Sequence, residues 1–557
     1  MFLSLNVFRN LVLSKTKAMK KIVLLLLFFL SQNIFSQEDA WVYFIDKPDA
    51  QFYLDNPLEM LSQRALDRRT AQNISLDITD VPIHQAYLDE LVNQSGIQIK
   101  AKSKWFNCVH VRGSVEAINS LLNLSFVQSV FFADRSLNSS NRLMTSKKAY
   151  KPVNKQMDVL TNFNYGTSTN QIQMLNGHLL HQQNYTGTGK IIAVMDAGFP
   201  EVDVITPFQR VRDNNQILGG YNFVDRNEDF YTRNSHGTMV LSTMAGYVDN
   251  QLVGTAPDAG YYLFITEDVG SENPVEESNW VEAAEVADSL GVDVINTSLG
   301  YFEYDNPNYS YTYENLNGTT AFMSRGANMA FSKGMICVTS AGNSGGSSNP
   351  YVAVPAEASY NLAVGAVRGD ESYASFSSVG PTFDGRIKPD VMAQGQNSTV
   401  SSTTGVITTA NGTSFSGPIM AGMVASFWQA IPWATNQQVV DFVRQSADRF
   451  SNPNEFYGYG IPDFNLALQN ALLSLPNNQK PIYFVYPNPF SENLNILNSN
   501  SSEDFNFSVY NALGQLVRSY TVSKNSNTIN VNDLERGCYF YKITAQGINQ
   551  AGKIIKN

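Results

Sequence analysis

A serine at the start of an apolar helical segment is the residue of this sequence best suited to attack a substrate. Ser414 lies in the tight turn 411–418 (NGTSFSGP), and the apolar run 419–428 follows it. Serine needs a base to remove its proton and a group that stabilises the resulting oxyanion. The free N–H groups at a helix start help with the second task. Taken alone, however, such a serine is more readily explained as a helix cap.

Polar residues upstream of this serine could supply the missing base and its support. Asp196 follows the apolar run 191–195, which predicts a strand buried on both faces. His236 begins a predicted helix of small and apolar residues, and Asn343 lies in a glycine-rich loop after another predicted strand. Functional groups of open α/β sheets gather at the carboxyl ends of strands. Each residue by itself is only weak evidence of a catalytic site, because Asp and Asn are also common in turns.

The chain order Asp, His, Asn, Ser resembles that of the subtilisin-like (subtilase) serine peptidases. The matching residues include the segment 298–300, which ends a further predicted strand: Asp196, His236, Asn343, Ser414, Ser298, Leu299 and Gly300. The segments 376–381 and 388–391 match two more signatures of the family. The resemblance covers roughly residues 166–475 and implies an α/β fold, with a parallel sheet that carries helices on both faces.

The resemblance also implies a role for each matching residue. Ser414 would attack the scissile carbonyl, His236 would move the proton and Asp196 would orient the imidazole. Asn343 would stabilise the oxyanion together with the backbone N–H of Ser414. The segment Ser298–Gly300 would pair with an extended peptide substrate. Calcium often stabilises such peptidases, but no acidic cluster of the sequence matches a calcium site that can be named. No other cofactor is expected.

The segment 301–314 follows the expected substrate-binding strand and is rich in tyrosine and acidic residues. In subtilases this position borders the substrate cleft. Tyrosines offer rigid contact area with a polar tip, and the acids add negative charge. The segment therefore either lines the non-primed subsites, where it would favour basic or bulky residues, or forms a solvated surface loop.

Three other functions compete with that of a peptidase. Residues 342–346 fit the Gly-x-Ser-x-Gly pattern of α/β-hydrolases, but that family needs a histidine after its serine, and all five histidines precede Ser344. His178 and His181 lie three apart in a predicted helix over 171–182, without a recognisable partner for zinc. An inactive surface adhesin on a subtilase scaffold is the remaining alternative. Inactive relatives usually lose a catalytic residue, whereas this chain keeps all of them.

The region before the predicted peptidase domain reads as export and maturation segments. A lysine-rich start and the apolar run 22–30 predict a signal peptide over 1–37, with Met19 as an alternative start. Residues 38–134 alternate predicted strands and helices, in a pattern that resembles the ferredoxin-like inhibitory propeptide of subtilases. The polar, basic segment 135–165 is predicted to be a processing linker. The peptidase domain would then span 166–475.

Beyond a predicted linker at 476–484, residues 485–557 form a series of short predicted strands that suggests a small all-β sandwich. This could be a carbohydrate-binding or stabilising module. The segments Tyr486–Pro489, 512–515, 537–539 and 553–556 resemble instead the type A C-terminal sorting domain of the type IX secretion system. That resemblance implies passage through the outer membrane, so we expect a secreted or cell-surface protein.

The composition is consistent with a soluble three-domain protein. The chain has 557 residues, of which 43% are apolar and 16% are charged. Its net charge of −11 argues against a nucleic-acid partner. The three cysteines are scattered and predict no disulfide framework. The expected partners are protein or peptide substrates, the protein's own propeptide as inhibitor and the type IX machinery. No transmembrane span is expected in the mature chain.

Overall fold

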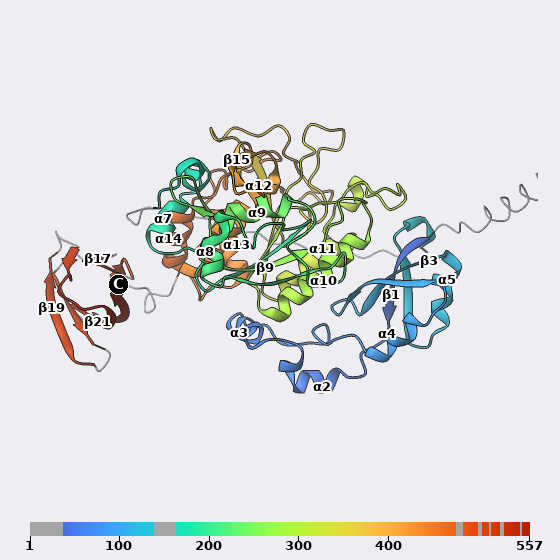
Figure 1. The fold of residues 1–557 in the computed structure, drawn as a ribbon, viewed down its shortest axis with the longest axis horizontal. Coiled ribbons are helices and arrows are strands. Elements are labelled where there is room, and N and C mark those ends of the chain that lie inside the picture. The colour runs from blue at the N-terminus through green and yellow to red at the C-terminus, as the bar shows by residue number, and fades with distance from the viewer. Residues whose placement is uncertain are drawn as a thin grey trace, which may run out of the picture. The chain divides into compact units, whose positions relative to one another are not determined.

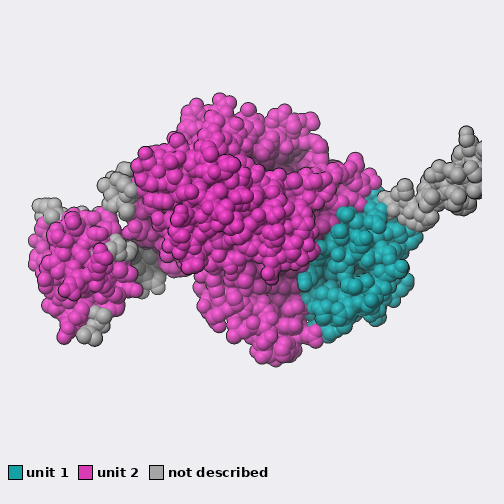
Figure 2. Space-filling model, viewed as in Figure 1, with its two compact units in different colours: residues 1–48, 83–102, 106–140 teal, residues 49–82, 103–105, 141–557 magenta. Residues whose placement is uncertain are grey.

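The computed structural model describes most of the chain in two compact units. The described residues are 37–138, 163–474, 483–488, 490–498, 504–511, 514–523, 528–545 and 548–556. One unit comprises described residues within 1–48, 83–102 and 106–140, and the other comprises the rest (Figure 2). The predicted signal peptide lies almost entirely outside the described residues, and so do most of the two predicted linkers at 135–165 and 476–484.

A seven-stranded parallel sheet forms the centre of the peptidase region (Figure 1). Its order is β13-β12-β11-β10-β5-β9-β6. The strands are β5 (Ile191–Asp196), β6 (Ile217–Asn222), β9 (Gly260–Ile265), β10 (Val294–Thr297), β11 (Ile336–Ser340), β12 (Leu362–Val367) and β13 (Val391–Gln394). Every residue of β5 after Ile191 is buried, which confirms the prediction of a strand covered on both faces. Every residue of β10, β11, β12 and β13 is buried as well.

Helices cover this sheet in two groups. In the first group, α12 packs against α9, α13 and α14 and against strands β10 to β13. In the second group, α10 and α11 pack together and against β5 and β11. The helices are α9 (His236–Ala245), α10 (Val275–Leu290), α11 (Phe322–Ser332), α12 (Thr413–Ala430), α13 (Asn436–Gln445) and α14 (Phe464–Ser474). The predicted α/β fold with a parallel sheet is therefore confirmed.

Shorter elements complete the peptidase region. They are α6 (Thr169–Gln173), α7 (Gly177–Gln182), α8 (Gln209–Asp213) and the short antiparallel pairs β7 (Tyr247–Val248) with β8 (Leu252–Val253) and β14 (Ser398–Ser401) with β15 (Ile407–Ala410). The prediction of a single helix over 171–182 is wrong, because the structure has two short helices, α6 and α7, in this region. Asn176 adopts a left-handed backbone conformation with φ of 50°, and this interrupts the helix between α6 and α7.

The N-terminal unit is built on a four-stranded sheet in the order β2-β3-β1-β4. Its elements are β1 (Glu38–Phe44), α4 (Gln85–Val92), β2 (Ile97–Ser103), β3 (Cys108–Gly113), α5 (Val115–Ser120) and β4 (Val127–Phe132). The pairs of β1 with β3 and with β4 are antiparallel. Ser114 caps α5 by accepting from the Ala117 N–H at 3.2 Å, as its position before the apolar run predicts. This β-α-β-β-α-β order is that of a ferredoxin-like module.

Residues 49–82 are inserted between β1 and α4, yet they belong to the other compact unit. They contain α2 (Ala50–Asp55) and α3 (Gln63–Ala71). Ser62 caps the start of α3. Met60, Leu61, Ala65 and Val81 form a small apolar core of their own. The sequence pattern does not predict that this segment packs with the peptidase region and not with the ferredoxin-like module.

The C-terminal region is a small β-sandwich, as expected. One sheet has the order β16-β17-β20 and the other β19-β18-β21-β22. The strands are β16 (Tyr483–Tyr486), β17 (Asn493–Asn498), β18 (Phe505–Tyr510), β19 (Leu516–Val522), β20 (Thr528–Asn530), β21 (Gly537–Ala545) and β22 (Ile548–Lys556). Leu494 of the first sheet and Phe507 and Ile543 of the second share one buried core. Among the described residues, no helix has both the length and the apolar composition that crossing a membrane requires.

Candidate active site

Asp196 and His236 form a hydrogen-bonded pair at the carboxyl end of β5. Asp196 Oδ1 accepts from His236 Nδ1 at 2.7 Å and from the Ala197 N–H at 2.8 Å. The Asp196 side chain is fully buried, whereas that of His236 is 28% exposed. Because Nδ1 is engaged by the carboxylate, Nε2 is the ring nitrogen left to take a proton.

The local sequence explains how the histidine reaches this aspartate. The Asn234 side chain accepts from the His236 N–H at 2.9 Å and thereby fixes the first turn of α9. The next residue must be small, since a Cβ at Gly237 would lie 2.4 Å from Gly198 O and 3.0 Å from Asp196 Cβ. Glycine therefore allows the start of α9 to approach the loop that carries Asp196.

The surroundings of His236 raise its pKa above the ordinary value of 6.5. Burial of the ring acts in the opposite direction and would lower the pKa. The charge of Asp196 and its hydrogen bond to the ring are the largest causes that raise the pKa against that burial. The imidazolium form is thus stabilised beside Asp196, as a proton-transferring histidine requires.

Ser414 is the second residue of α12, where backbone N–H groups have no partner within the helix. Its Oγ donates to Ser298 O at 3.4 Å, and Ser298 Oγ donates to Ser414 O at 3.1 Å. The ring of His236 lies 6.1 Å from that of Phe415, so the starts of α9 and α12 are neighbours. Ser414 and His236, both described residues, form no direct hydrogen bond in this structure.

Asn343 lies in the loop after β11, and its amide is held in one orientation. Its Oδ1 accepts from the Thr413 N–H at 2.9 Å and from Thr413 Oγ1 at 3.0 Å. A Cβ added at Gly412 would lie 3.6 Å from Asn343 Nδ2 and 3.7 Å from Ser414 Oγ. The amide nitrogen and the serine hydroxyl therefore face the same small space, which the absence of a side chain at Gly412 leaves open.

The segment Ser298–Gly300 directly continues β10 toward Ser414. Leu299 is partly exposed and Gly300 is exposed. Within the described residues, the backbone groups of these two residues form no hydrogen bonds. Tyr301 is tied down instead, because its N–H donates to Val354 O at 2.8 Å. The segment is thus an extended strip with free backbone groups next to the serine, which suits pairing with a peptide.

The segment 301–314 is only partly at the surface: its acids Glu303, Asp305 and Glu314 are exposed, but most of its tyrosines are buried. Tyr301, Tyr304 and Tyr311 are buried rather than presented to substrate or solvent. Tyr301 donates to Glu267, and Tyr304 and Tyr311 donate to Glu277 Oε1 at 2.7 and 2.6 Å. These hydroxyls donate hydrogen bonds to buried carboxylates, so the tyrosines hold the segment against the domain.

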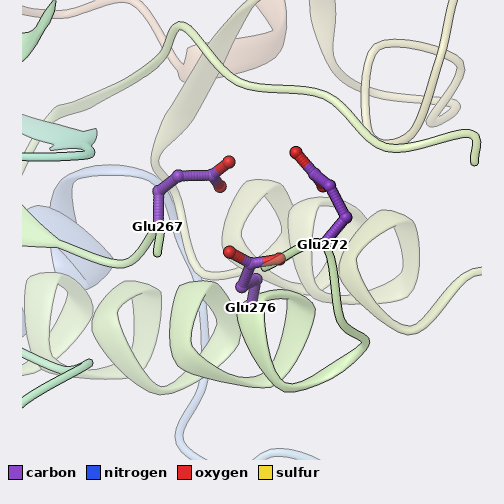
Figure 3. Close-up of side chains that lie close together, drawn as sticks. All are labelled: Glu267, Glu272 and Glu276. Atoms are coloured by element: carbon purple, nitrogen blue, oxygen red, sulfur yellow. The ribbon is translucent and has the colours of Figure 1, made fainter. Parts of the chain in front are cut away.

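Glu267, Glu272 and Glu276 form an acidic cluster that the sequence did not reveal (Figure 3). One carboxylate oxygen from each lies within 4.8 Å of the others. Burial raises the pKa of Glu267 to about 8 and that of Glu276 to about 9. Calcium takes about six to eight oxygen ligands, more than these three side chains supply. We therefore do not assign the cluster as a calcium site.

His181 has a structural role and is not available as a zinc ligand. Its Nδ1 contacts Tyr165 Oη at 2.9 Å, and its Nε2 contacts Thr255 O at 3.0 Å. Burial lowers its pKa to about 4. Both ring nitrogens are engaged within the protein, which removes the basis of the zinc alternative.

Taken together, the parallel sheet and the Asp, His, Asn and Ser side chains at its strand ends and helix starts define the class of the α/β serine peptidases. Comparison with known proteins identifies the particular family: the subtilase family matches residues 187–460, and this chain belongs to it as a serine endopeptidase. The Bacteroidota propeptide domain of peptidase family S8 matches residues 39–151. A secretion system C-terminal sorting domain matches residues 484–557 and indicates type IX export to the cell surface or the extracellular space.

Curated subtilisins are similar to the peptidase region. Subtilisin NAT of Bacillus subtilis subsp. natto and subtilisin E of Bacillus subtilis (strain 168) are each 33% identical over 304 residues, which is 54% of this chain and 70% of each relative. Subtilisin of Bacillus pumilus is 32% identical over 304 residues, and the match covers 98% of its length.

Proposed function

We propose that this chain is a secreted endopeptidase that hydrolyses peptide bonds through Asp196, His236 and Ser414. The observation that carries the proposal is the 2.7 Å hydrogen bond between Asp196 and His236, whose ring lies beside the start of the helix that bears Ser414. The inactive adhesin is the alternative. It predicts no reaction at Ser414 despite this arrangement.

The proposed reaction begins with proton transfer from Ser414 to His236 Nε2. Ser414 Oγ leaves its long contact with Ser298 O and attacks the scissile carbonyl as the imidazole takes the proton. Catalytic hydrogen bonds are often loose in free enzymes and tighten with substrate. The imidazolium, held by Asp196, then donates its proton to the leaving amine. Water repeats the sequence and releases the acyl group from the serine.

Asn343 Nδ2 and the Ser414 N–H would hold the oxyanion that forms in each step. Support comes from the orientation of the Asn343 amide, whose oxygen is engaged by Thr413 while its nitrogen faces the space above Gly412. The free backbone groups of Leu299 and Gly300 would align the substrate as an extended strand, which recognises main chain without demanding a particular sequence.

Substitution of the proposed nucleophile tests this function. Ser414→Ala should abolish hydrolysis of denatured casein and covalent labelling by a fluorophosphonate probe. Ser344→Ala is the matched control, since Ser344 is exposed in the neighbouring glycine-rich loop and should leave both signals intact. Failure of the processed wild-type protein to label would favour the adhesin.

We further propose that the enzyme matures by a cut within the linker 135–165. This cut removes residues 38–134. The peptidase domain would then span 166–475, and residues 485–557 would direct export. N-terminal sequencing of secreted enzyme should give a start after residue 134. Deletion of 485–557 should hold the protein in the periplasm, and normal secretion of that variant would contradict the export step.

A further inference from the structure

The inserted segment 49–82, called here the propeptide arm, lies within the region that matches the propeptide domain but contacts the peptidase region. Its α3 packs against α10. The Ser62 N–H donates to Ser289 O at 2.9 Å at the end of α10. The arm has its own apolar core and a capped helix, so it meets the peptidase as a folded element.

Two arginines of the arm converge on one buried aspartate of the peptidase. Arg69 lies between Asp288 Oδ2, at 2.7 Å, and Asp80 of the arm, at 2.8 Å. Arg68 donates to Asp288 Oδ1 and to Val292 O. The Asp288 side chain is fully buried and those of the two arginines nearly so. Buried charges of this kind are tolerated when they are paired, and losing one partner is strongly unfavourable.

Further polar contacts extend this surface to both sides of Asp288. Arg64 donates to Gly291 O at 2.9 Å and to Asp293 Oδ2 at 2.5 Å. On the other side, Lys333 at the end of α11 lies 3.0 Å from Asp80 Oδ1. Gln72 donates to Gly334 O at 2.9 Å and accepts from the Asn436 N–H at 2.9 Å. The arm thus contacts α10, α11 and α13.

These contacts lie at the end of the sheet opposite to the proposed active site. Residues that the arm contacts come just before three strands: Gly189 before β5, Asp293 before β10 and Gly334 before β11. The proposed site residues end or follow the same strands: Asp196, Ser298 and Asn343. Because the strands are parallel, their amino ends share one edge of the sheet and their carboxyl ends the other. The arm therefore does not occupy the site around Ser414.

We propose that the propeptide arm is an anchor that keeps the propeptide attached to the peptidase after the linker is cut, through a site remote from the catalytic residues. Asp288 and Lys333 form the receiving surface, and Arg64, Arg68 and Arg69 are the main attachment points. The anchor holds the propeptide near the enzyme and slows its departure. This inference rests on the proposed function only in that the propeptide must leave during maturation.

The test measures how long the cut propeptide stays bound to the full chain. A recognition sequence for a site-specific protease is placed within 141–160 of a Ser414→Ala chain, so cleavage needs no activity of the enzyme itself. After the cut, dissociation is followed by dilution and gel filtration. Combined Arg68→Ala and Arg69→Ala substitutions should accelerate release by at least about tenfold, because they leave Asp288 buried without its partners.

Two further variants keep the test decisive. Arg64→Ala removes a 40% exposed side chain that is not part of the arm's apolar core, and it should accelerate release less strongly. Asp67→Asn is the matched control on the exposed face of α3 and should leave the release rate unchanged. Hydrogen exchange in β1 to β4 reports whether the double variant unfolds the propeptide module. If it does, the Arg64→Ala result decides.

Unchanged release from both the arginine double variant and Arg64→Ala would overturn the anchor. Equal acceleration of release by Asp67→Asn would also overturn the anchor proposal. Faster release would then result from unfolding of α3 in general and not from loss of the arginine contacts. These outcomes are independent of the catalytic proposal, which fails only if the wild-type enzyme does not label or hydrolyse.

Discussion

Thr413 fixes the amide of Asn343, because its backbone N–H and its hydroxyl both donate to Asn343 Oδ1, at 2.9 and 3.0 Å. Thr413 Oγ1 also accepts from the Gly342 N–H at 3.1 Å, which ties the start of α12 to the loop after β11. One threonine thus sets the position of the proposed oxyanion donor relative to the proposed nucleophile, its neighbour Ser414.

Removing the Thr413 hydroxyl should therefore lower the rate without weakening substrate binding. Thr413→Val keeps the backbone donor and the shape of the side chain but loses the side-chain donor to Asn343. We expect kcat to fall by about tenfold, the value of one neutral hydrogen bond, with KM little changed. Thr413→Ser restores the hydroxyl and should recover most of the rate. Steady-state kinetics on a peptide substrate would measure both, and an unchanged kcat in Thr413→Val would contradict the positioning role.

Truncation of Asn343 itself should have a larger effect of the same kind. Asn343→Ala removes a donor that acts chiefly on the charge developing in the transition state. Loss of one such donor costs about 10²–10³ in kcat. KM should stay nearly constant. Asn349→Ala, in the exposed part of the same loop, is the control and should behave as wild type. A rise in KM with kcat preserved would mean that Asn343 contacts the substrate but not the oxyanion.

Strands β5 and β11 of the central sheet could be predicted from the sequence, because each is an apolar run that leads into polar residues. Asp196 and Asn343 stand out for that reason, and His236 does so because it begins a helix of small and apolar residues. The orientation of the Asn343 amide could not be predicted, because it depends on a contact with Thr413 that is 70 residues away in the chain. The reciprocal contact between Ser298 and Ser414 could not be predicted either, because it joins residues 116 positions apart in the chain.

The burial of charged and tyrosine-rich segments could not be predicted from local sequence pattern. Arg68 and Arg69 look like the solvated face of a helix, but both are buried against Asp288. Tyr304 and Tyr311 look like surface residues in an acidic loop, yet they donate to the buried carboxylate of Glu277. In each case a distant partner compensates the burial of a polar group, and local pattern carries no information about that partner.

The pH profile of the enzyme should reflect the raised pKa of His236. As a general base the ring must be neutral, so kcat/KM should fall as the pH falls through this pKa. Burial of the ring acts against this rise, but the charge and the hydrogen bond of Asp196 raise the pKa, which puts the midpoint of the acid limb above 6.5. Measurement of kcat/KM between pH 5 and 9 at constant ionic strength checks this expectation. A midpoint below the ordinary histidine value would contradict it.

Stability of the peptidase domain should depend strongly on Asp390. This carboxylate accepts from Lys388 Nζ at 2.7 Å, from Arg444 at 2.6 Å and from the Ala363 N–H at 2.8 Å. The Lys388 side chain is only 2% exposed, so Asp390→Ala would leave a buried ammonium without its counter-ion. Such a change costs about 3–5 kcal/mol in the free energy of unfolding.

Urea unfolding in a Ser414→Ala background, which prevents self-digestion, would measure the effect of Asp390→Ala on that free energy. Asp249→Ala removes an exposed acid and serves as the control, for which the free energy of unfolding should change by at most about 0.5 kcal/mol. The double substitution Lys388→Met with Asp390→Ala should recover part of the loss, because it removes the unpaired charge. Equal stability of the Asp390→Ala and Asp249→Ala proteins would show that the buried ion pairs contribute nothing to the fold.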